Sequence, residues 1–176
     1  MAEGLASLGE WERSDYGGDL RASDAGRAVT VMGWVHGRRD HGGVIFIDLR
    51  DRSGLIQIVL DPERSTAAHA AASGVRLEYV VAVQGTIVPR SAETVNADLP
   101  TGAIEIVGSE LRVLNTARPS PFPVDDEIDI AEAVRLRYRY LDLRRPRMFR
   151  NLWLRHRLAV RTRGYLNANG FLEVET

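Results

Sequence analysis

The chain has 176 residues, of which 44% are hydrophobic and 27% are charged, so it can bury a core beneath a polar surface. Cysteine is absent, which excludes disulfides and thiolate metal sites. The chain has no apolar run of about 18 residues, and its start lacks the basic head and apolar stretch of a signal peptide. We therefore expect no membrane segment and a cytoplasmic location.

The net charge of -1 hides an uneven distribution of arginine, which supplies all 23 cationic side chains. Residues 1–134 hold 12 arginines against 21 acidic residues, whereas residues 135–163 hold 11 arginines and one acid, Asp142. The second segment can attract phosphate. Two alternatives stay open: a helical surface made soluble by arginine, or a face that pairs with acidic groups in a part of the protein outside these 176 residues.

In chain order, residues 1–15 lack a clear hydrophobic periodicity and are expected to form a mobile tail. Alternating apolar and polar residues then predict five strands, over residues 29–38, 44–50, 55–60, 78–90 and 103–114. The first hairpin loop is His41-Gly42-Gly43, in which glycine permits a positive φ. A helix is predicted to begin at Asp61-Pro62 and to run to about Gly74.

Three strands, one helix and two further strands follow the order of an OB-fold barrel, which binds oligonucleotides on its second and third strands and the flanking loops. We therefore predict a mainly β chain in which residues 16–115 form a five-stranded OB-fold barrel with one helix between strands three and four. A small barrel that binds protein or sugar has the same pattern.

Two outward residues on neighbouring strands point to a base-reading surface. Ile45, Ile47 and Leu49 are the aliphatic set of the second strand, so Phe46 falls on its opposite, solvent-facing side. Gln57 alternates in the same way with the aliphatic residues of the third strand. An exposed ring can stack on a base while an amide reads its edge. The alternative is that Phe46 packs beneath a loop.

The strand-like alternation of apolar and polar residues ends before residues 116–145, which are predicted to be a linker or hinge. Pro119, Pro121 and Pro123 stiffen the first part of this segment. A short helix is predicted over 130–139. A long helix follows from Pro146 to Asn169, closed by Gly170, and its apolar residues suit packing on two sides. Residues 171–176 read as a strand without a partner, so we expect the chain to be a fragment.

Several stretches together resemble one known family. Gly33-Trp34-Val35, Arg38-Arg39-Asp40, the stretch 46–51 and Gln57 are similar to the anticodon-binding barrel of bacterial aspartyl-tRNA synthetases. Residues 137–146 resemble the hinge of that family. Residues 170–176 resemble the opening of its class II motif 1, so residues 146–176 are expected to be the truncated start of a catalytic domain.

The resemblance implies roles for individual residues. Phe46 matches the aromatic residue that stacks on the middle anticodon base, and Gln57 matches the amide that reads that base. Contacts to the anticodon bases and backbone are implied for Arg38, Arg39, Arg90, Asn96 and Glu105, whose carboxylate suits the amino and imino groups of a guanine. The alternative is a solvated loop for the two adjacent arginines and an ordinary strand residue for Glu105. Gly37 stands where relatives usually carry a basic residue.

Two positions bear on tRNA discrimination. His41 stands where discriminating relatives tend to carry leucine, and relatives with His-Gly-Gly commonly charge both tRNA(Asp) and tRNA(Asn). The second position linked to that behaviour falls near Glu93, which matches neither the lysine nor the glycine expected there. A strictly tRNA(Asp)-specific enzyme therefore stays an alternative, as does a loop histidine without a role.

The family activates aspartate with ATP and magnesium and transfers it to tRNA, but the residues for this chemistry lie in motifs beyond residue 176. The chain has no glycine-rich phosphate loop and no spaced metal-ligand cluster, so we expect no catalytic residue, metal site or cofactor within it. The long helix is expected to be a homodimer element in the parent enzyme. Two other interpretations remain: a free-standing OB-fold binder of single-stranded nucleic acid, and the corresponding domain of an asparaginyl- or lysyl-tRNA synthetase.

Overall fold

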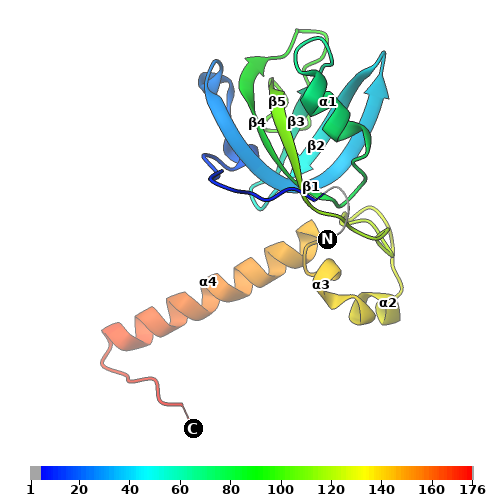
Figure 1. Ribbon diagram of the computed structural model, residues 1–176. Coiled ribbons are helices and arrows are strands. Elements are labelled where there is room, and N and C mark those ends of the chain that lie inside the picture. Colours follow the sequence, from blue (N-terminus) through cyan, green and yellow to red (C-terminus); the bar gives the residue numbers. More distant parts are fainter. Residues whose placement is uncertain (1–4, 176) are drawn as a thin grey trace. The chain divides into compact units, whose positions relative to one another are not determined.

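The computed structural model describes residues 5–175, and the chain divides into two compact units, Met1–Ser120 and Pro121–Thr176. In the first unit five strands close into a barrel in the order β1-β2-β3-β5-β4 (Figure 1). Strands β3 and β5 pair in parallel, and the other neighbours pair antiparallel. The predicted OB-fold is therefore confirmed. The strands are β1 (Ala28–His41), β2 (Val44–Arg50), β3 (Leu55–Leu60), β4 (Val80–Pro89) and β5 (Ile104–Asn115).

The barrel interior is filled by the aliphatic half of each strand. In β2 Ile45, Ile47 and Leu49 are at most 1% exposed, while the residues between them are partly exposed. Burying such a side chain contributes about 1.5–3 kcal/mol relative to leaving it in water. Since side chains alternate along a strand, this burial sends Phe46 to the outer face, as the sequence predicted.

The helix between the third and fourth strands is present but shorter than predicted. Helix α1 (Thr66–Ser73) is capped by the hydroxyl of Ser65, which accepts from the backbone N–H of Ala68 at 3.2 Å. The predicted start at Asp61 is wrong, because the Asp61 carboxylate accepts from the N–H of Glu63 and closes a separate turn. A side chain that caps a local turn competes with helix formation at that point.

Strand β1 extends to His41, three residues beyond its predicted end, and the hairpin turn is made by Gly42 and Gly43. Both glycines have a positive φ, of 60° and 82°. This conformation suits a two-residue turn between antiparallel strands and is costly for residues with a Cβ. The glycine pair therefore sets where the first hairpin reverses.

Part of the predicted N-terminal tail contacts the barrel. The backbone N–H of Ala6 donates to the carbonyl of Val113 in β5 at 2.8 Å, and the guanidinium of Arg112 lies 4.0 Å from the centre of the Trp11 ring. A cation above an aromatic face is attracted by the ring quadrupole. Residues 1–4 of the predicted tail lie outside the described residues.

The second unit contains three helices, α2 (Glu132–Arg137), α3 (Arg139–Asp142) and α4 (Pro146–Ala168). The single short helix predicted over 130–139 is thus two helices, separated at Tyr138. Helix α4 begins at the predicted proline and ends one residue before the predicted end, with Gly170 at a φ of 83°. Residues 171–175 form no strand, because a strand needs a hydrogen-bonding partner and the described part of this unit contains no other strand.

Asp142 is the centre of the second unit. Its side chain is fully buried and accepts hydrogen bonds from Arg135 at 2.9 Å and from Arg139, with Arg145 3.6 Å away. The hydrogen bond from Arg135 lowers the pKa of Asp142 below its usual value, although burial alone would raise it. The only acid in the arginine-rich segment 135–163 therefore holds three of its arginines together.

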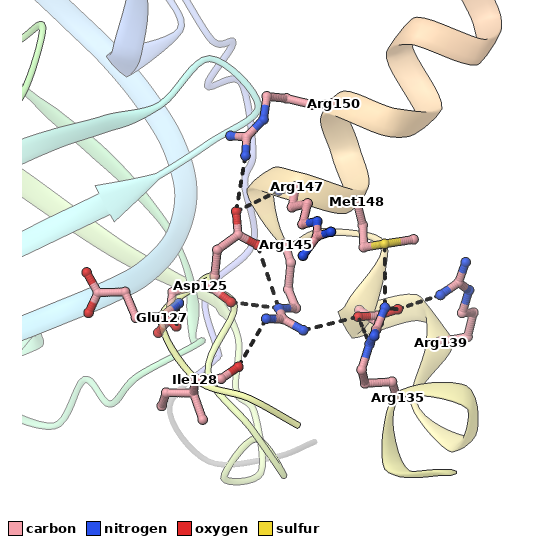
Figure 2. Close-up of polar contacts among 11 residues, drawn as sticks. Asp125, Glu127, Ile128, Arg135, Arg139, Arg145, Arg147, Met148 and Arg150 are labelled. Atoms are coloured by element: carbon pink, nitrogen blue, oxygen red, sulfur yellow. Dashed lines mark hydrogen bonds and ion pairs between the residues drawn. The ribbon is translucent and has the colours of Figure 1, made fainter. Parts of the chain in front are cut away.

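Arg145 links the Asp142 cluster to the acidic stretch 125–129 (Figure 2). Its guanidinium donates to the carbonyls of Asp125, at 2.7 Å, and Ile128, at 3.1 Å. The carboxylate of Asp126 accepts from the backbone N–H of Arg147 at 2.7 Å, in the first turn of α4. An acceptor there satisfies an otherwise unpaired helix N–H and interacts well with the helix dipole.

Among residues 5–175 the structure contains no helix that is both long enough and apolar enough to cross a membrane.

The Asp142 cluster predicts a defined dependence on pH. Because the folded-state pKa of Asp142 is lowered, its stabilising effect is complete above its unfolded pKa of about 3.9 and is lost as pH falls through the lower, folded value. Asp142→Asn should lower the hydrogen-exchange protection of amides 138–145 at pH 7 by about tenfold or more, because the arginines lose an ionised partner.

The barrel amides serve as the internal control, since Asp142 lies in the other unit. After correction for intrinsic exchange rates, acid should reduce the protection of amides 138–145 in the wild type and should add little in Asp142→Asn. Equal acid sensitivity in both proteins would contradict the role given to Asp142.

Candidate nucleic-acid interface

The outer face of β1, β2 and β3 brings several of the predicted residues together. In the register of β1 with β2, Arg39 lies opposite Phe46 and His41 lies opposite Val44. In the register of β2 with β3, Asp48 lies opposite Gln57. Residues opposite each other in an antiparallel pair project to the same face. Phe46, Gln57, Arg39 and His41 therefore share one side of the barrel wall.

A chain of hydrogen bonds crosses this face. Nη2 of Arg39 donates to Oδ1 of Asp48 and to Oε1 of Gln57, at 3.1 Å each. Nε2 of Gln57 donates to Oε2 of Glu105, in β5, at 3.0 Å. The amide of Gln57 is therefore held from both sides, by a guanidinium on β1 and by a carboxylate on β5. We call Asp48, Arg39, Gln57 and Glu105 the outer-face network.

Arg90 lies at the edge of this network but faces largely inward. Its Nε is 3.7 Å from Oε2 of Glu105 and donates to the carbonyl of Ile104 at 3.0 Å, while Nη1 donates to the carbonyl of Thr94 at 3.3 Å. The Arg90 side chain is only 5% exposed. In this conformation it supports Glu105 and the loop between β4 and β5, and it offers little surface to a ligand.

Arg38 is separated from the other predicted residues. Its Nε donates to the carbonyl of Ala72 and its Nη2 to the carbonyl of Ser73, both at 3.3 Å. These carbonyls belong to the last turn of α1, where a cation interacts favourably with the helix dipole. Arg38 and Arg39, adjacent in sequence, thus project to opposite sides of β1.

The remaining predicted residues lie on loops outside the network. Asn96 is exposed in the loop between β4 and β5, where its side-chain oxygen accepts from the backbone N–H of Asp98 at 3.0 Å. Glu93 is exposed in a turn of the same loop. His41 is exposed at the end of β1, one residue before the hairpin turn and on the Phe46 side.

Asp48 was absent from the predicted site residues, although it joins the network. Its place two residues after Phe46 on the same strand was the available signal, since residues i and i+2 share a face. Gly37 lies opposite Asp48 across a β-bulge in β1, and a Cβ at Gly37 would approach Oδ2 of Asp48 to 2.7 Å. The glycine therefore leaves room for the carboxylate.

The assembled groups suit an unpaired nucleotide. A partly exposed ring offers a stacking platform, the amide and carboxylate offer donors and acceptors for a base edge, and the 60% exposed side chain of Arg39 offers positive charge. Within residues 5–175 no three His, Asp or Glu side chains are grouped so that they could hold a metal ion. The ring, the amide and the guanidinium of this face are groups that can stack on, hydrogen-bond to and attract a nucleotide.

Comparison with known proteins gives two matched segments, one on each side of the boundary between the two structural units at Ser120. A family described as OB-fold nucleic acid binding domain matches residues 29–114, and a family described as tRNA synthetases class II (D, K and N) matches residues 131–176. An aspartate-tRNA(Asp/Asn) ligase from Geotalea uraniireducens is 55% identical over 96% of this chain, and one from Moorella thermoacetica is 58% identical over all of it. The chain thus joins an OB-fold nucleic acid binding domain to a segment of the class II (D, K and N) tRNA synthetases, and over nearly its whole length it is similar to aspartate-tRNA(Asp/Asn) ligases.

The chain spans 28% of the Geotalea relative and 29% of the Moorella relative. An aspartyl-tRNA synthetase structure from Entamoeba histolytica superposes with a TM-score of 0.77 at 17% identity, covering 89% of this chain and 37% of that one. This likeness independently supports the fold. The family resemblance inferred from the hinge and barrel residues is confirmed, and the individual contact residues stay predictions.

The opposite orientations of Arg38 and Arg39 generate a paired prediction. Arg38→Ala should destabilise the barrel by about 1 kcal/mol through loss of its bonds to the α1 carbonyls, and it should weaken RNA binding less than Arg39→Ala does, because Arg38 would have to leave those carbonyls to reach RNA. Arg39→Ala should weaken RNA binding severalfold and leave the unfolding midpoint nearly unchanged. Urea unfolding and RNA titration of both variants measure the two effects. A larger loss of stability in Arg39→Ala together with a larger loss of RNA affinity in Arg38→Ala would contradict the observed orientations.

Proposed function

We propose that this chain is the anticodon-recognising part of an aspartate-tRNA ligase. The observation that carries the proposal is the projection of Phe46 and Gln57 from the same outer face, with Gln57 fixed between Arg39 and Glu105. The identity of 55% to a protein named aspartate-tRNA(Asp/Asn) ligase supports the substrate class. In this function the face binds the unpaired anticodon bases of tRNA(Asp).

Each group on the face has a distinct task. The Phe46 ring stacks on the middle anticodon base, and the amide of Gln57 reads the edge of that base. Glu105 keeps acceptor positions beyond its bond to Gln57, and these suit the amino and imino groups of a guanine. Arg39 has further N–H donors that can bind phosphate oxygens of the RNA backbone. Arg38, Arg90 and Asn96 are retained as proposed contacts. The two arginines would have to leave their present carbonyl partners, whereas Asn96 is already exposed.

We infer that the catalytic residues of the whole enzyme lie outside residues 5–175. A ligase of this family would join aspartate to tRNA with ATP and magnesium, but residues 5–175 do not provide a metal site. We infer that this chain delivers the anticodon end of the tRNA and that the remaining part of the enzyme performs the reaction. The parent enzyme is proposed to act in the cytoplasm.

Helix α4 is proposed to contribute to a homodimer in the full-length enzyme. Several large apolar side chains of α4 are exposed, including Phe149, Trp153 and Leu158, which are 50%, 55% and 65% exposed. Exposed aromatic and aliphatic side chains grouped on one helix are typical of surfaces that another subunit or domain covers.

We also propose that the enzyme accepts tRNA(Asn) as well as tRNA(Asp). The two anticodons differ only at the third base, C in GUC and U in GUU. His41 stands on the Phe46 side of β1 at the hairpin tip, where a polar ring in place of a leucine can tolerate either base. Glu93 is the second position assigned to this discrimination, although its side chain lies outside the network. The strictly tRNA(Asp)-specific enzyme is the competing possibility.

The stacking role of Phe46 can be measured directly. Base–aromatic stacking contributes roughly 1–3 kcal/mol per base, so Phe46→Ala should weaken binding of tRNA(Asp) on the order of ten- to a hundredfold. A fluorescence titration measures this change. Leu77→Ala, which removes an exposed apolar side chain from the loop before β4, is the control and should bind normally. Unchanged binding by Phe46→Ala would remove the stacking assignment.

Dual recognition is tested by titrating the chain with tRNA(Asp) and tRNA(Asn) transcripts at one salt concentration. We expect Kd values within about tenfold of each other, since the face holds no bulky apolar group at His41 to reject uracil. A preference of about a hundredfold or more for tRNA(Asp) would defeat this proposal.

A further inference from the structure

We propose that Asp48 is a positioning residue that fixes the orientation of the Gln57 amide and thereby determines which base edge Gln57 accepts. The inference rests on the proposed function of the outer face. Asp48 touches no nucleotide in this scheme; it acts through Arg39.

The first step is that Gln57 can adopt only one amide orientation. Arg39 can only donate hydrogen bonds, whereas the ionised carboxylate of Glu105 can only accept them. The carbonyl oxygen of Gln57 faces Arg39 and its amide nitrogen faces Glu105. A flipped amide would direct N–H at the guanidinium and oxygen at the carboxylate. Both charge-assisted hydrogen bonds would then be lost.

The second step is that Arg39 depends on Asp48 for its position. The same nitrogen, Nη2, contacts Asp48 and Gln57, so the ion pair and the amide bond share one geometry. The Arg39 side chain is 60% exposed and has many rotamers, whereas Asp48 is short and 26% exposed. Holding a long, exposed side chain in one conformation costs entropy unless a partner fixes it.

The third step concerns the space that Asp48 occupies. Gly37 lies opposite Asp48, and a Cβ there would come within 2.7 Å of Oδ2. The contact is with the end of a flexible side chain, so Gly37→Ala can be accommodated if the carboxylate moves. This substitution therefore displaces Asp48 without changing the charge of the face.

The functional consequence concerns discrimination between bases. With its oxygen engaged by Arg39 and one N–H engaged by Glu105, Gln57 presents its remaining N–H and lone pair in fixed places. A flipped amide exchanges donor and acceptor toward the base. Loss of Asp48 should therefore weaken discrimination, while removal of a negative charge by itself should strengthen the binding of any RNA.

The test is a titration of two anticodon stem-loop RNAs, one with GUC and one in which cytosine replaces the middle uracil. The ratio of the two Kd values should fall by about tenfold in Asp48→Ala and in Gly37→Ala, the expected size of one lost hydrogen bond to a base. Asp40→Ala is the matched control, because it removes an exposed carboxylate from the same hairpin outside the network. Its ratio should stay within about twofold of wild type.

A second readout does not depend on RNA. In the free chain, the side-chain amide resonances of Gln57 should shift in Asp48→Ala and Gly37→Ala, and they should keep their wild-type positions in Asp40→Ala. If Asp48→Ala fails to fold, Gly37→Ala carries the same test without loss of charge.

Failure of this inference is distinguishable from failure of the proposed function. If Phe46→Ala loses binding while both network variants keep wild-type discrimination and Gln57 resonances, the positioning role of Asp48 is overturned and anticodon binding stands. If wild type binds neither hairpin, or if Phe46→Ala binds as wild type does, the proposed function fails and the inference with it.

Discussion

The two-residue alternation of β2 and β3 is the constraint on which the recognition face depends. Ile45, Ile47, Ile56 and Ile58 fill the barrel interior and are at most 1% exposed, so each strand has only one orientation that buries its aliphatic side. A slip of one residue would expose this whole set to water. The hydrophobic core therefore also fixes which side chains face outward, including Phe46 and Gln57.

The polar half of the face is organised by charge before any ligand is present. Gln57 lies between a donor-only guanidinium and an acceptor-only carboxylate, so its amide is oriented in the free protein. Such preorganisation lowers the entropic cost of binding. The arrangement places two carboxylates, Asp48 and Glu105, on a surface proposed to meet RNA. We expect Arg39 to offset their repulsion of phosphate, and we expect the two carboxylates to contribute to selectivity rather than to affinity.

Much of this architecture could be predicted from the sequence, because it follows from local periodicity. Alternation identified the strands and their inward sides, and proline at position 146 marked the start of α4. The start of α1 was misplaced because Asp61 closes a turn with its own side chain, a choice that helix propensities do not reveal. Residues 171–175 have the alternation of a strand and were predicted to lack a partner, and in the structure they do not adopt strand pairing.

The site could be predicted in composition but not in connectivity. Alternation implies that Arg38 and Arg39 point to opposite sides, yet only the position of α1 shows that Arg38 is occupied by helix carbonyls. Asp48 was missed because its role arises from the register of β2 with both neighbouring strands. Asp142 stood out as the only acid among arginines, but its burial depends on how the short helices pack.

The most direct test of the account is an NMR measurement of the chain bound to an anticodon stem-loop carrying GUC. Intermolecular NOEs between the ring protons of Phe46 and the middle base, with upfield-shifted base protons, are the predicted result. NOEs from that base to other parts of the chain, with the Phe46 resonances unchanged on binding, would contradict the central claim that this face reads the anticodon.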